Sequence, residues 1–260
     1  MKFAFSTVGS DWTFEKIAAA AKELGYDGVE LNFPSNVPAE LDLHGTSAAC
    51  LAGGRGAVGK RTEDKNRTAH LRSLIDCSAS IGCPLVKVME TSIPPGQNRA
   101  NAALVLGDWL LPLSDYAASH AVSLVLDISQ SLRTARELWT ILDRANHPSL
   151  GCCLDLLAAA RIGDSPQVAV PMLNSRILDV QISDANDLTQ SAVDCNPGHG
   201  VVPIDTAIAR LRGIGYSGWM TVKWPTSSDI ATERFSRALV ALRAWNSAPE
   251  RVKTKAKAAR

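Results

Sequence analysis

The sequence predicts an α/β protein folded as a single parallel (β/α)8 barrel. Short apolar runs alternate with longer helical stretches eight times along the 260 residues. The runs are apolar at consecutive positions, which is typical of parallel strands that are covered on both faces. Several of them end in a polar residue, and a barrel gathers the carboxyl ends of its strands around one site. Eight units in a chain of this length favour a closed barrel over an open doubly wound sheet.

Each repeat supplies one expected strand and, in most cases, one expected helix. The expected strands are Lys2–Ser6, Asp27–Leu31, Ser47–Ala52, Pro84–Met89, Val122–Asp127, Leu150–Asp155, Ile177–Ser183 and Trp219–Lys223. The expected helices are Thr13–Leu24, Thr62–Ile81, Asn98–His120, Leu132–Ala145, Ile204–Arg212 and Asp229–Trp245. Asp11 or Thr13 can cap the first helix, and Gly25 ends it. Pro112 is expected to kink or split the third helix, and Arg161–Leu173 is expected to be irregular or weakly helical.

Composition sets loose limits on what the chain can do. With 46% hydrophobic residues, 260 residues can bury a full core as one barrel or as two smaller domains. The net charge of +1 gives no sign of a nucleic-acid partner, and no apolar run is long enough to span a bilayer. The start of the chain reaches Asp11 too soon for a secretory signal. Six cysteines without a Cys-x-x-Cys spacing indicate reduced thiols and a cytoplasmic location.

Residues 1–246 are therefore assigned to the barrel, and residues 247–260 to a basic tail that is expected to be disordered. The tail carries five cationic residues among small ones: Arg251, Lys253, Lys255, Lys257 and Arg260. Such an end is typically solvated rather than bound to a partner.

Four polar residues end consecutive expected strands: Asp127, Asp155, Gln181 and Lys223. The first three offer carboxylate or amide oxygens, which are ligands for a divalent metal ion. The fourth is a cation and cannot serve as a ligand in this way. The four residues therefore indicate a metal site in which one of the four ligand positions holds a cation.

Several ordered segments carry a resemblance to a known family. They are KFAFST at the first strand, Leu24–Leu31 at the second, Leu150–Asp155 at the sixth, Asp179–Asp184 at the seventh, Pro197–Gly200 in the following loop and Gly215–Lys223 at the eighth. Together they resemble the xylose isomerase-like TIM-barrel superfamily of sugar-phosphate isomerases and epimerases, over nearly all of residues 1–245. The resemblance implies the barrel fold. Activity needs a separate argument, because one fold hosts many functions.

The resemblance also implies a metal site against which this chain can be compared. Members of the family typically bind one divalent ion, such as Mn²⁺, Mg²⁺ or Zn²⁺, through a Glu, an Asp, a His or Gln, and a Glu from strands five to eight. The corresponding positions here hold Asp127, Asp155, Gln181 and Lys223. A His expected three residues after the sixth-strand Asp is replaced by Ala158. Both positions at which the family has a proton-carrying Glu are therefore changed.

An ammonium group among the ligands opposes metal binding. Unit charges about 4 Å apart interact by about 4 kcal/mol at an effective dielectric constant near 20, so metal binding at Asp127, Asp155 and Gln181 is expected to be weak or absent. Lys223 can instead take the place of the ion and bridge the two carboxylates. Two alternatives stay open: Lys223 acts as a base or Schiff-base nucleophile, or Glu90 and Asp184 rebuild a metal site. Either of these two carboxylates can equally be satisfied locally at the end of its strand.

A glycine-rich loop, Gly54–Lys60, matches half of a Walker A motif. Arg61 stands where that motif needs Ser or Thr, so a P-loop nucleotide site is not expected. At the mouth of a barrel, Arg55 and Lys60 could hold a phosphate group, and an exposed loop with solvated charges is the alternative.

The remaining candidates for ligand contact are His199 and Trp224. His199 lies in the turn that follows the seventh strand, where a turn explains it better than a nucleophile–base pair with Cys195. Trp224 follows Lys223 at the expected mouth, where its ring could stack on a sugar or pack against Pro225. Cys152 and Cys153 are adjacent strand residues, so their side chains should point to opposite faces.

Two hypotheses of function follow. In the first, the chain is a sugar-phosphate isomerase/epimerase-like enzyme that acts on a small sugar or polyol, with Asp127 and Lys223 as its catalytic residues. In the second, it is a pseudoenzyme with a binding or assembly role, in which Lys223 replaces the metal. Both place the ligand at the carboxyl ends of the strands, and both leave the oligomeric state open. The expected ligand-contacting residues are Glu90, Asp184, His199, Trp224, Arg55 and Lys60.

Overall fold

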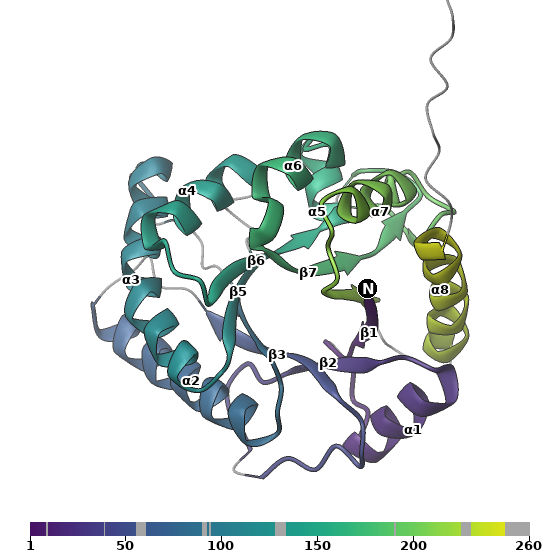
Figure 1. Cartoon of the computed structure of the whole chain (residues 1–260), viewed down its shortest axis with the longest axis horizontal. Helices are drawn as coiled ribbons and strands as arrows, with labels where there is room; N and C mark the ends of the chain where they lie inside the picture. The colour runs from purple at the N-terminus through teal and green to yellow at the C-terminus, as the bar shows by residue number, and fades with distance from the viewer. Residues whose placement is uncertain are drawn as a thin grey trace, which may run out of the picture.

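The computed structural model describes residues 1–8, 10–38, 40–55, 61–89, 93, 95–127, 134–189, 191–224 and 230–247, with the backbone alone at 55, 61–64, 230 and 231. Its centre is a closed barrel of eight parallel strands in the order β1-β10-β7-β6-β5-β4-β3-β2 (Figure 1). The barrel strands are β1 (Lys2–Ser6), β2 (Gly28–Asn32), β3 (Ala48–Arg55), β4 (Leu85–Met89), β5 (Ser123–Asp127), β6 (Leu150–Asp155), β7 (Ile177–Ile182) and β10 (Trp219–Val222). The predicted fold class is therefore confirmed.

Helices surround the barrel and cover the outer face of the strands (Figure 1). They are α1 (Phe14–Leu24), α2 (Arg61–Ser80), α3 (Arg99–Ser119), α4 (Ala135–Ala145), α5 (Leu156–Arg161), α6 (Pro166–Leu173), α7 (Ile204–Gly213) and α8 (Ile230–Ser247), with one 3-10 turn, η1 (Asn174–Arg176). Two short strands, β8 (Asp184–Ala185) and β9 (Asp194–Cys195), form a separate antiparallel pair. The start of α1 follows the sequence signal, because the Thr13 side chain accepts a hydrogen bond from the Lys16 N–H and Gly25 ends the helix at φ 77°.

One local expectation was wrong, and a second was wrong in part, since a split of α3 is contradicted while a kink stays a prediction. The stretch after β6 is regular: α5 ends at Arg161, and α6 begins with Pro166 in the first turn, where proline loses no helical hydrogen bond. Helix α3 also continues through Pro112 instead of splitting. Both Pro112 and Asp108, whose carbonyl loses its partner, lie on the exposed side of the helix, so water can solvate that carbonyl.

The strands divide the hydrophobic core into two parts. Their outward residues pack against the helices, and a smaller cluster, Ala4, Ala49, Cys50, Leu85, Val125, Cys153 and Trp219, fills the inside of the barrel. Cys152 belongs to the outer part and Cys153 to the inner one, as the strand period predicts. Gly28 makes room for the large ring inside, because a Cβ there would lie 2.9 Å from the Trp219 side chain.

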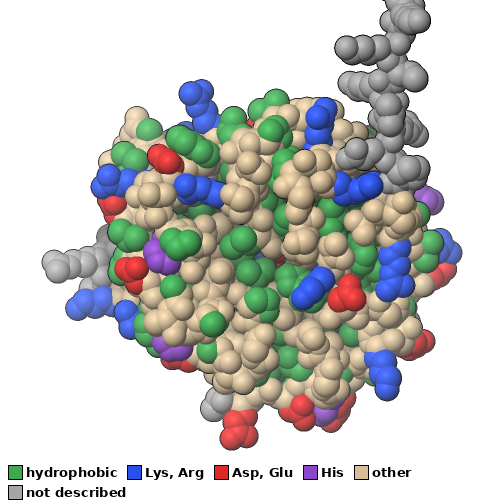
Figure 2. Space-filling model, viewed as in Figure 1, with side chains coloured by type: hydrophobic (Ala, Val, Ile, Leu, Met, Phe, Trp, Pro, Cys, Tyr) green, Lys and Arg blue, Asp and Glu red, His purple; other side chains and the backbone are tan. Residues whose placement is uncertain are grey.

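The face seen in Figure 2 carries Lys and Arg interspersed with Asp and Glu, in keeping with the net charge of +1. In the described part of the chain, none of the helices combines the length and the apolar character needed to cross a membrane. The predicted basic tail lies outside the described residues.

Candidate active site at the mouth of the barrel

The outermost ion pair of the barrel joins Lys223, directly after β10, to Asp155, the last residue of β6. Lys223 Nζ lies 3.6 Å from Asp155 Oδ2, which agrees with one half of the predicted bridge, and the contact with Asp127 stays a prediction. The side chain of Lys223 is 38% exposed and that of Asp155 is 10% exposed, so the pair is partly open to solvent rather than fully buried. Burial disfavours the charged amine, yet Asp155 and Asp127 together raise the pKa of Lys223. Lys223 is therefore held as an ammonium ion.

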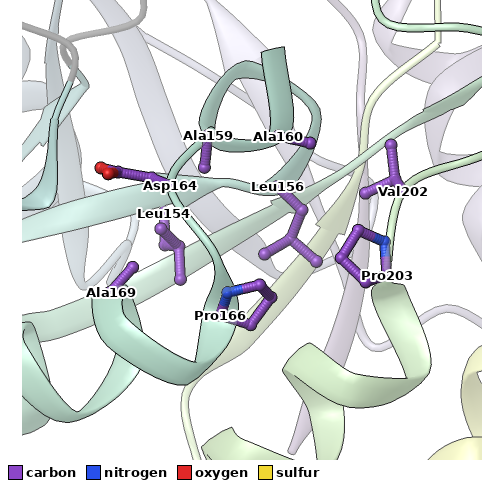
Figure 3. Close-up of a pocket in the computed structure, with 9 residues that line it drawn as sticks. All are labelled: Leu154, Leu156, Ala159, Ala160, Asp164, Pro166, Ala169, Val202 and Pro203. Atoms are coloured by element: carbon purple, nitrogen blue, oxygen red, sulfur yellow. The ribbon is translucent and has the colours of Figure 1, made fainter. Parts of the chain in front are cut away.

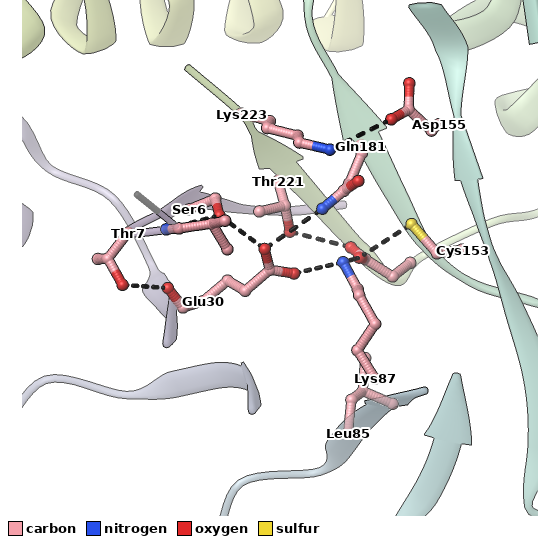
Figure 4. A network of polar contacts seen from close by, with 12 residues as sticks. Ser6, Thr7, Glu30, Leu85, Lys87, Cys153, Asp155, Gln181, Thr221 and Lys223 are labelled. Atoms are coloured by element: carbon pink, nitrogen blue, oxygen red, sulfur yellow. Dashed lines mark hydrogen bonds and ion pairs between the residues drawn. The ribbon is translucent and has the colours of Figure 1, made fainter. Parts of the chain in front are cut away.

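Asp155 has a second role at the start of α5. Its Oδ1 accepts a hydrogen bond from the Ala158 N–H at 2.9 Å, which caps the helix. The side chain thus uses one oxygen for the helix and turns the other to Lys223 (Figure 4). Ala158, which stands where the family typically has a His, therefore contacts this carboxylate through its backbone N–H.

Asp127 ends β5 and is 6% exposed. Burial raises its pKa, and Asp155 adds to the rise, while Lys87 and Lys223 oppose it. A carboxyl group with a raised pKa exchanges its proton closer to neutral pH than an ordinary aspartate does, and this suits it to general acid–base work.

Beneath the mouth lies a buried ion triad of Glu30, Lys87 and Asp179. The ammonium of Lys87 pairs with the carboxylate of Glu30, and its Nζ lies 3.0 Å from Asp179 Oδ2. All three side chains are at most 1% exposed. Burial alone would lower the pKa of Lys87, but Asp179 and Glu30 keep it well above its ordinary value.

Further hydrogen bonds satisfy both carboxylates of this triad. Ser6 Oγ donates to Glu30 Oε1 at 2.7 Å, and Thr221 Oγ1 donates to Asp179 Oδ1 at 2.9 Å. The Cys153 thiol also donates to Asp179, at 3.4 Å. Buried charges persist in a protein when they are paired and hydrogen-bonded in this way.

Gln181 connects the triad to the mouth. Its Nε2 donates to Glu30 Oε1 at 3.2 Å, and its side chain is 2% exposed (Figure 4). Its Oε1 is buried and receives no hydrogen bond from any residue that the structure describes. Gln181 is thus anchored on one side and has an unused acceptor on the other.

Glu30, Lys87 and Asp179 are not among the site residues predicted from the sequence. A signal was present, because each is a charged residue in the middle of a strand expected to be buried on both faces, as in DGVEL, LVKVM and ILDVQ. Such a residue must find a partner inside the barrel. The identity of the partners depends on the strand register, which the sequence does not give.

Asp184 is engaged by the backbone around it, and its contact with a ligand stays a prediction. Its side chain is fully buried, and it accepts four backbone N–H groups: those of Ala185 and Val202 at 2.9 and 3.0 Å on Oδ1, and those of Gly198 and Gly200 at 2.9 Å each on Oδ2. A Cβ at Gly200 would lie 2.3 Å from Asp184 Oδ1, which explains the glycine. The carboxylate therefore holds the Pro197–Gly200 turn in place.

Trp224 is buried and His199 is exposed, and a ligand contact of either residue stays a prediction. Trp224 is 3% exposed, and the Arg234 guanidinium lies 4.6 Å from its ring centroid, so the ring packs inside the protein in this structure. His199 is exposed in the turn, where its N–H donates to the Asn196 carbonyl at 2.9 Å. Glu90, Lys60 and the side chain of Arg55 lie outside the described residues.

The described residues at the mouth, taken by their chemistry, do not fit the family's divalent metal. Among the residues that the structure describes, no three His, Cys, Asp or Glu side chains lie close enough together to share an ion. The fourth ligand position holds the ammonium of Lys223, which contacts Asp155, and Asp155 is also engaged by the cap of α5. A cation at this place repels a metal ion and occupies a carboxylate that the ion would need.

A separate apolar hollow lies outside the barrel strands, between β6, α5, α6 and the segment that leads into α7 (Figure 3). Its lining is Leu154, Leu156, Ala159, Ala160, Asp164, Pro166, Ala169, Val202 and Pro203. Asp164 is the only charged group among the described residues that line it, and it accepts the Ala135 N–H at 2.6 Å. None of the predicted site residues that the structure describes lines this hollow.

Comparison with known proteins places this architecture among related chains. A 2-oxo-tetronate isomerase from Pectobacterium atrosepticum is 25% identical over 84% of this chain and 90% of that relative. A 3-dehydroshikimate dehydratase from Pseudomonas putida is 24% identical, but the match covers 52% of this chain and 22% of that relative.

Solved structures show the same fold. The IOLI protein with a bound zinc atom has a TM-score of 0.81 at 16% identity, covering 95% of this chain and 98% of that one. D-psicose 3-epimerase from Clostridium cellulolyticum, solved with D-tagatose, also has a TM-score of 0.81, at 15% identity, covering 95% of this chain and all of that one. At these identities the likeness concerns the fold alone. The model of the xylose isomerase-like TIM barrel family, however, matches residues 18–245, and the chain therefore belongs to that family.

Proposed function

We propose that the chain binds a small polyhydroxy carbonyl compound, a sugar or a sugar acid, at the mouth of the barrel and isomerises it with Lys223 in the position of the metal. The observation that carries this proposal is the Lys223 ammonium at the carboxyl end of the strands, 3.6 Å from Asp155 and electrostatically coupled to Asp127. The family and the name of the isomerase relative support the substrate class.

The proposed chemistry is proton transfer next to a carbonyl group. A base removes the proton from the hydroxyl-bearing carbon beside the carbonyl, and the electron pair moves to form an enediolate. Return of a proton to the former carbonyl carbon, with a shift of the hydroxyl proton, completes the isomerisation. The reaction therefore needs one group that carries a proton and one that stabilises negative charge on oxygen.

Asp127 and Lys223 match these two needs. The pKa of Asp127 is raised, so its carboxylate is a stronger base than that of an ordinary aspartate and is better suited to remove a proton from carbon. The Lys223 ammonium offers fixed positive charge to the developing oxyanion, as a metal ion would in the family. The raised pKa of Lys223 argues against a Schiff base, because a protonated amine has no lone pair with which to attack a carbonyl.

The pseudoenzyme hypothesis is the second candidate function, and one observation favours it. Only one carboxylate, Asp127, remains at the two positions where the family has a proton-carrying Glu, and the other position holds Lys223. A chain of this kind could bind a sugar without turning it over. The two candidates share a ligand and differ in whether carbon-bound protons are exchanged.

Deuterium exchange separates them. Protein treated with EDTA is incubated in D₂O with 2-oxo-tetronate, D-tagatose or D-psicose, and ¹H NMR follows loss of the proton beside the carbonyl against a protein-free control. We expect exchange by the wild type without metal, a decrease of about 10²–10⁴-fold in Asp127→Asn, and no change in Lys65→Met, which alters an exposed lysine on α2. Elemental analysis of protein purified without chelator accompanies the assay.

Three outcomes of this experiment would contradict the proposal in whole or in part. Exchange that appears only with added Mn²⁺ would contradict the role given to Lys223. Binding of a probe by calorimetry without any exchange would leave the pseudoenzyme as the better description. Neither binding nor exchange with any of the three compounds would reject both candidates.

A further inference from the structure

We infer that Gln181 presents its carboxamide oxygen to a hydroxyl group of the bound ligand, and that Lys87, acting through Glu30, is the residue that holds it in this orientation. The inference deepens the proposed function, on which it rests for the ligand class. It assigns a hydrogen-bond donor, a ligand hydroxyl, to the unpaired Gln181 Oε1 at the base of the mouth. It also assigns the buried triad a second role besides stability, which is to orient Gln181.

The orientation of the Gln181 amide follows from its neighbour. Nε2 lies 3.2 Å from Glu30 Oε1, a carboxylate oxygen that only accepts hydrogen bonds. Turning the amide over would bring two acceptor oxygens together at this distance. Nε2 must therefore face Glu30, and Oε1 must face away from it.

Glu30 is in turn fixed by charge. Its Oε2 pairs with Lys87, and its Oε1 accepts the Ser6 hydroxyl at 2.7 Å. Lys87 is held from the other side by Asp179, 3.0 Å away. Since these groups are at most 1% exposed, solvent cannot replace any of them. Removing the ammonium would leave two buried carboxylates that repel each other, and Glu30 would lose the position that fixes the amide.

The free oxygen lies next to the proposed binding place. Gln181 follows Asp179 by two residues on β7, so it occupies the next inward position towards the mouth. Figure 4 shows Gln181 between the buried carboxylates and the Lys223–Asp155 pair. Thr221 is the β10 partner of Gln181, and Lys223 follows Thr221 by two residues, so it occupies the next inward position beside Gln181. Its side chain is 38% exposed, so a ligand can reach the ammonium from the mouth. We expect the ligand's carbonyl oxygen at this ammonium and its adjacent hydroxyl at Gln181 Oε1.

The chemistry of this atom limits what can bind there. An amide oxygen accepts a hydrogen bond from a hydroxyl group but cannot bind a keto, carboxylate or phosphate oxygen. Gln181 and Lys223 therefore offer an acceptor and a charged donor side by side, which suits a hydroxyl next to a carbonyl. A ligand without that hydroxyl leaves a buried acceptor unpaired and should therefore bind more weakly.

The test compares 2-oxo-tetronate with its 3-deoxy analogue, 4-hydroxy-2-oxobutanoate, by calorimetry. We expect the wild type to bind 2-oxo-tetronate about tenfold more tightly, the value of one hydrogen bond of average strength. Gln181→Met has a side chain of similar length without the acceptor oxygen, and it should bind the two compounds equally. Lys65→Met should keep the wild-type preference. An unchanged preference in Gln181→Met would overturn the inference.

The role of Lys87 needs a readout that loss of stability alone would not move. The first is the preference for the hydroxyl compound, and the second is the side-chain amide resonance of Gln181 in a ¹⁵N spectrum. We expect Lys87→Met to reduce the preference and shift the resonance. Where that variant does not fold, Glu30→Gln removes the same charge interaction and should do the same. A folded variant that keeps both the preference and the resonance would contradict the positioning role.

Xylitol and erythritol separate this inference from the proposed function, because they carry hydroxyl groups and cannot be isomerised. A shift of the Gln181 amide resonance on adding either polyol, without deuterium exchange in any keto compound, would support the inference and reject the enzyme. Exchange without a shift from any hydroxyl-bearing probe would support the enzyme and overturn the inference.

Discussion

Two lysines lie inside the same barrel at different depths, and they are held in different ways. Lys87 is 1% exposed and pairs with two carboxylates, Glu30 and Asp179. Lys223 is 38% exposed, and its contact with Asp155 is 3.6 Å long. The pKa of each is raised by neighbouring carboxylates against the effect of burial. The deeper lysine is thus enclosed by its partners, whereas the outer one keeps part of its surface for another molecule.

The difference follows from where each residue stands on its strand. Water cannot solvate a charged group in the middle of a barrel strand, so every polar atom around that group needs a protein partner. A charge at the carboxyl end of a strand reaches the mouth, where water or a ligand can complete its environment. We therefore assign stability and positioning to the inner layer, and ligand contact to the outer one.

The largest effect is expected at Lys87. Lys87→Met keeps most of the volume but leaves Glu30 and Asp179 buried without a counter-charge. The free energy of unfolding should fall by about 3–5 kcal/mol, the typical penalty for breaking a buried ion pair. Urea denaturation measures it, with Lys65→Met as the exposed control. A loss below about 1 kcal/mol would show that the inner layer is not held by this charge.

Much of the barrel could be predicted because the pattern of strands depends on local sequence. Strands β1 and β6 have the expected bounds, and Lys223 lies beside Asp155 because both end strands that close around one mouth. The triad could not be predicted in the same way. Glu30 and Lys87 are 57 residues apart, and only the barrel's closure and register bring them together.

Two other features depended on tertiary context. The sequence leaves open whether Asp184 contacts a ligand or is satisfied locally, and only the fold shows that four backbone N–H groups of the nearby chain converge on it. The sequence likewise leaves open whether Trp224 stacks on a ligand or packs, and consecutive residues at a strand end point in opposite directions. Its ring accordingly packs against Arg234, on α8.

The second prediction concerns Lys223→Glu, a substitution that makes the outer layer resemble the family's metal site. Lys223→Glu places a third carboxylate near Asp155 and Asp127, and repulsion at this partly exposed place should cost about 1–2 kcal/mol. Added Mn²⁺ should restore stability, since an ion at about 100 times its Kd that binds only the folded protein contributes about 2.7 kcal/mol. Thermal melts with and without Mn²⁺ measure both effects. A melting temperature that does not respond to metal would show that the mouth is not a latent metal site.

The third prediction concerns Asp127, whose carboxyl group interacts electrostatically with the lysines of both layers. Because its pKa is raised in the folded protein, the folded state holds this proton more tightly than the unfolded state. Its contribution to stability is therefore complete below the unfolded pKa, near 3.8, and is lost as pH rises through the folded pKa. Asp127→Asn removes the titration, so the stability of the variant relative to wild type should increase over that window by about 1.4 kcal/mol for each unit by which the two pKa values differ.

Urea denaturation between pH 4 and pH 8 measures this difference. The wild type and Asp127→Asn are compared at each pH, so that titration of every other group cancels. A difference that does not change with pH would mean that the carboxyl has the same pKa in both states. A difference that falls with pH would mean that Asp127 is stabilised as a carboxylate, and its proposed role as a proton carrier near neutral pH would lose its basis.

The smallest effect is expected for Lys223→Met. If the Lys223–Asp155 pair were buried like the inner triad, its loss would cost as much as the loss of Lys87. The pair is partly open instead, and Asp155 keeps its hydrogen bond from the Ala158 N–H when the ammonium is removed. Partly exposed ion pairs contribute about 0–1 kcal/mol, so Lys223→Met should be at least 2 kcal/mol more stable than Lys87→Met. If urea denaturation shows equal losses in the two variants, the contrast between the layers does not hold. If only ligand binding and deuterium exchange are lost in Lys223→Met, the lysine at the mouth serves the ligand rather than the fold.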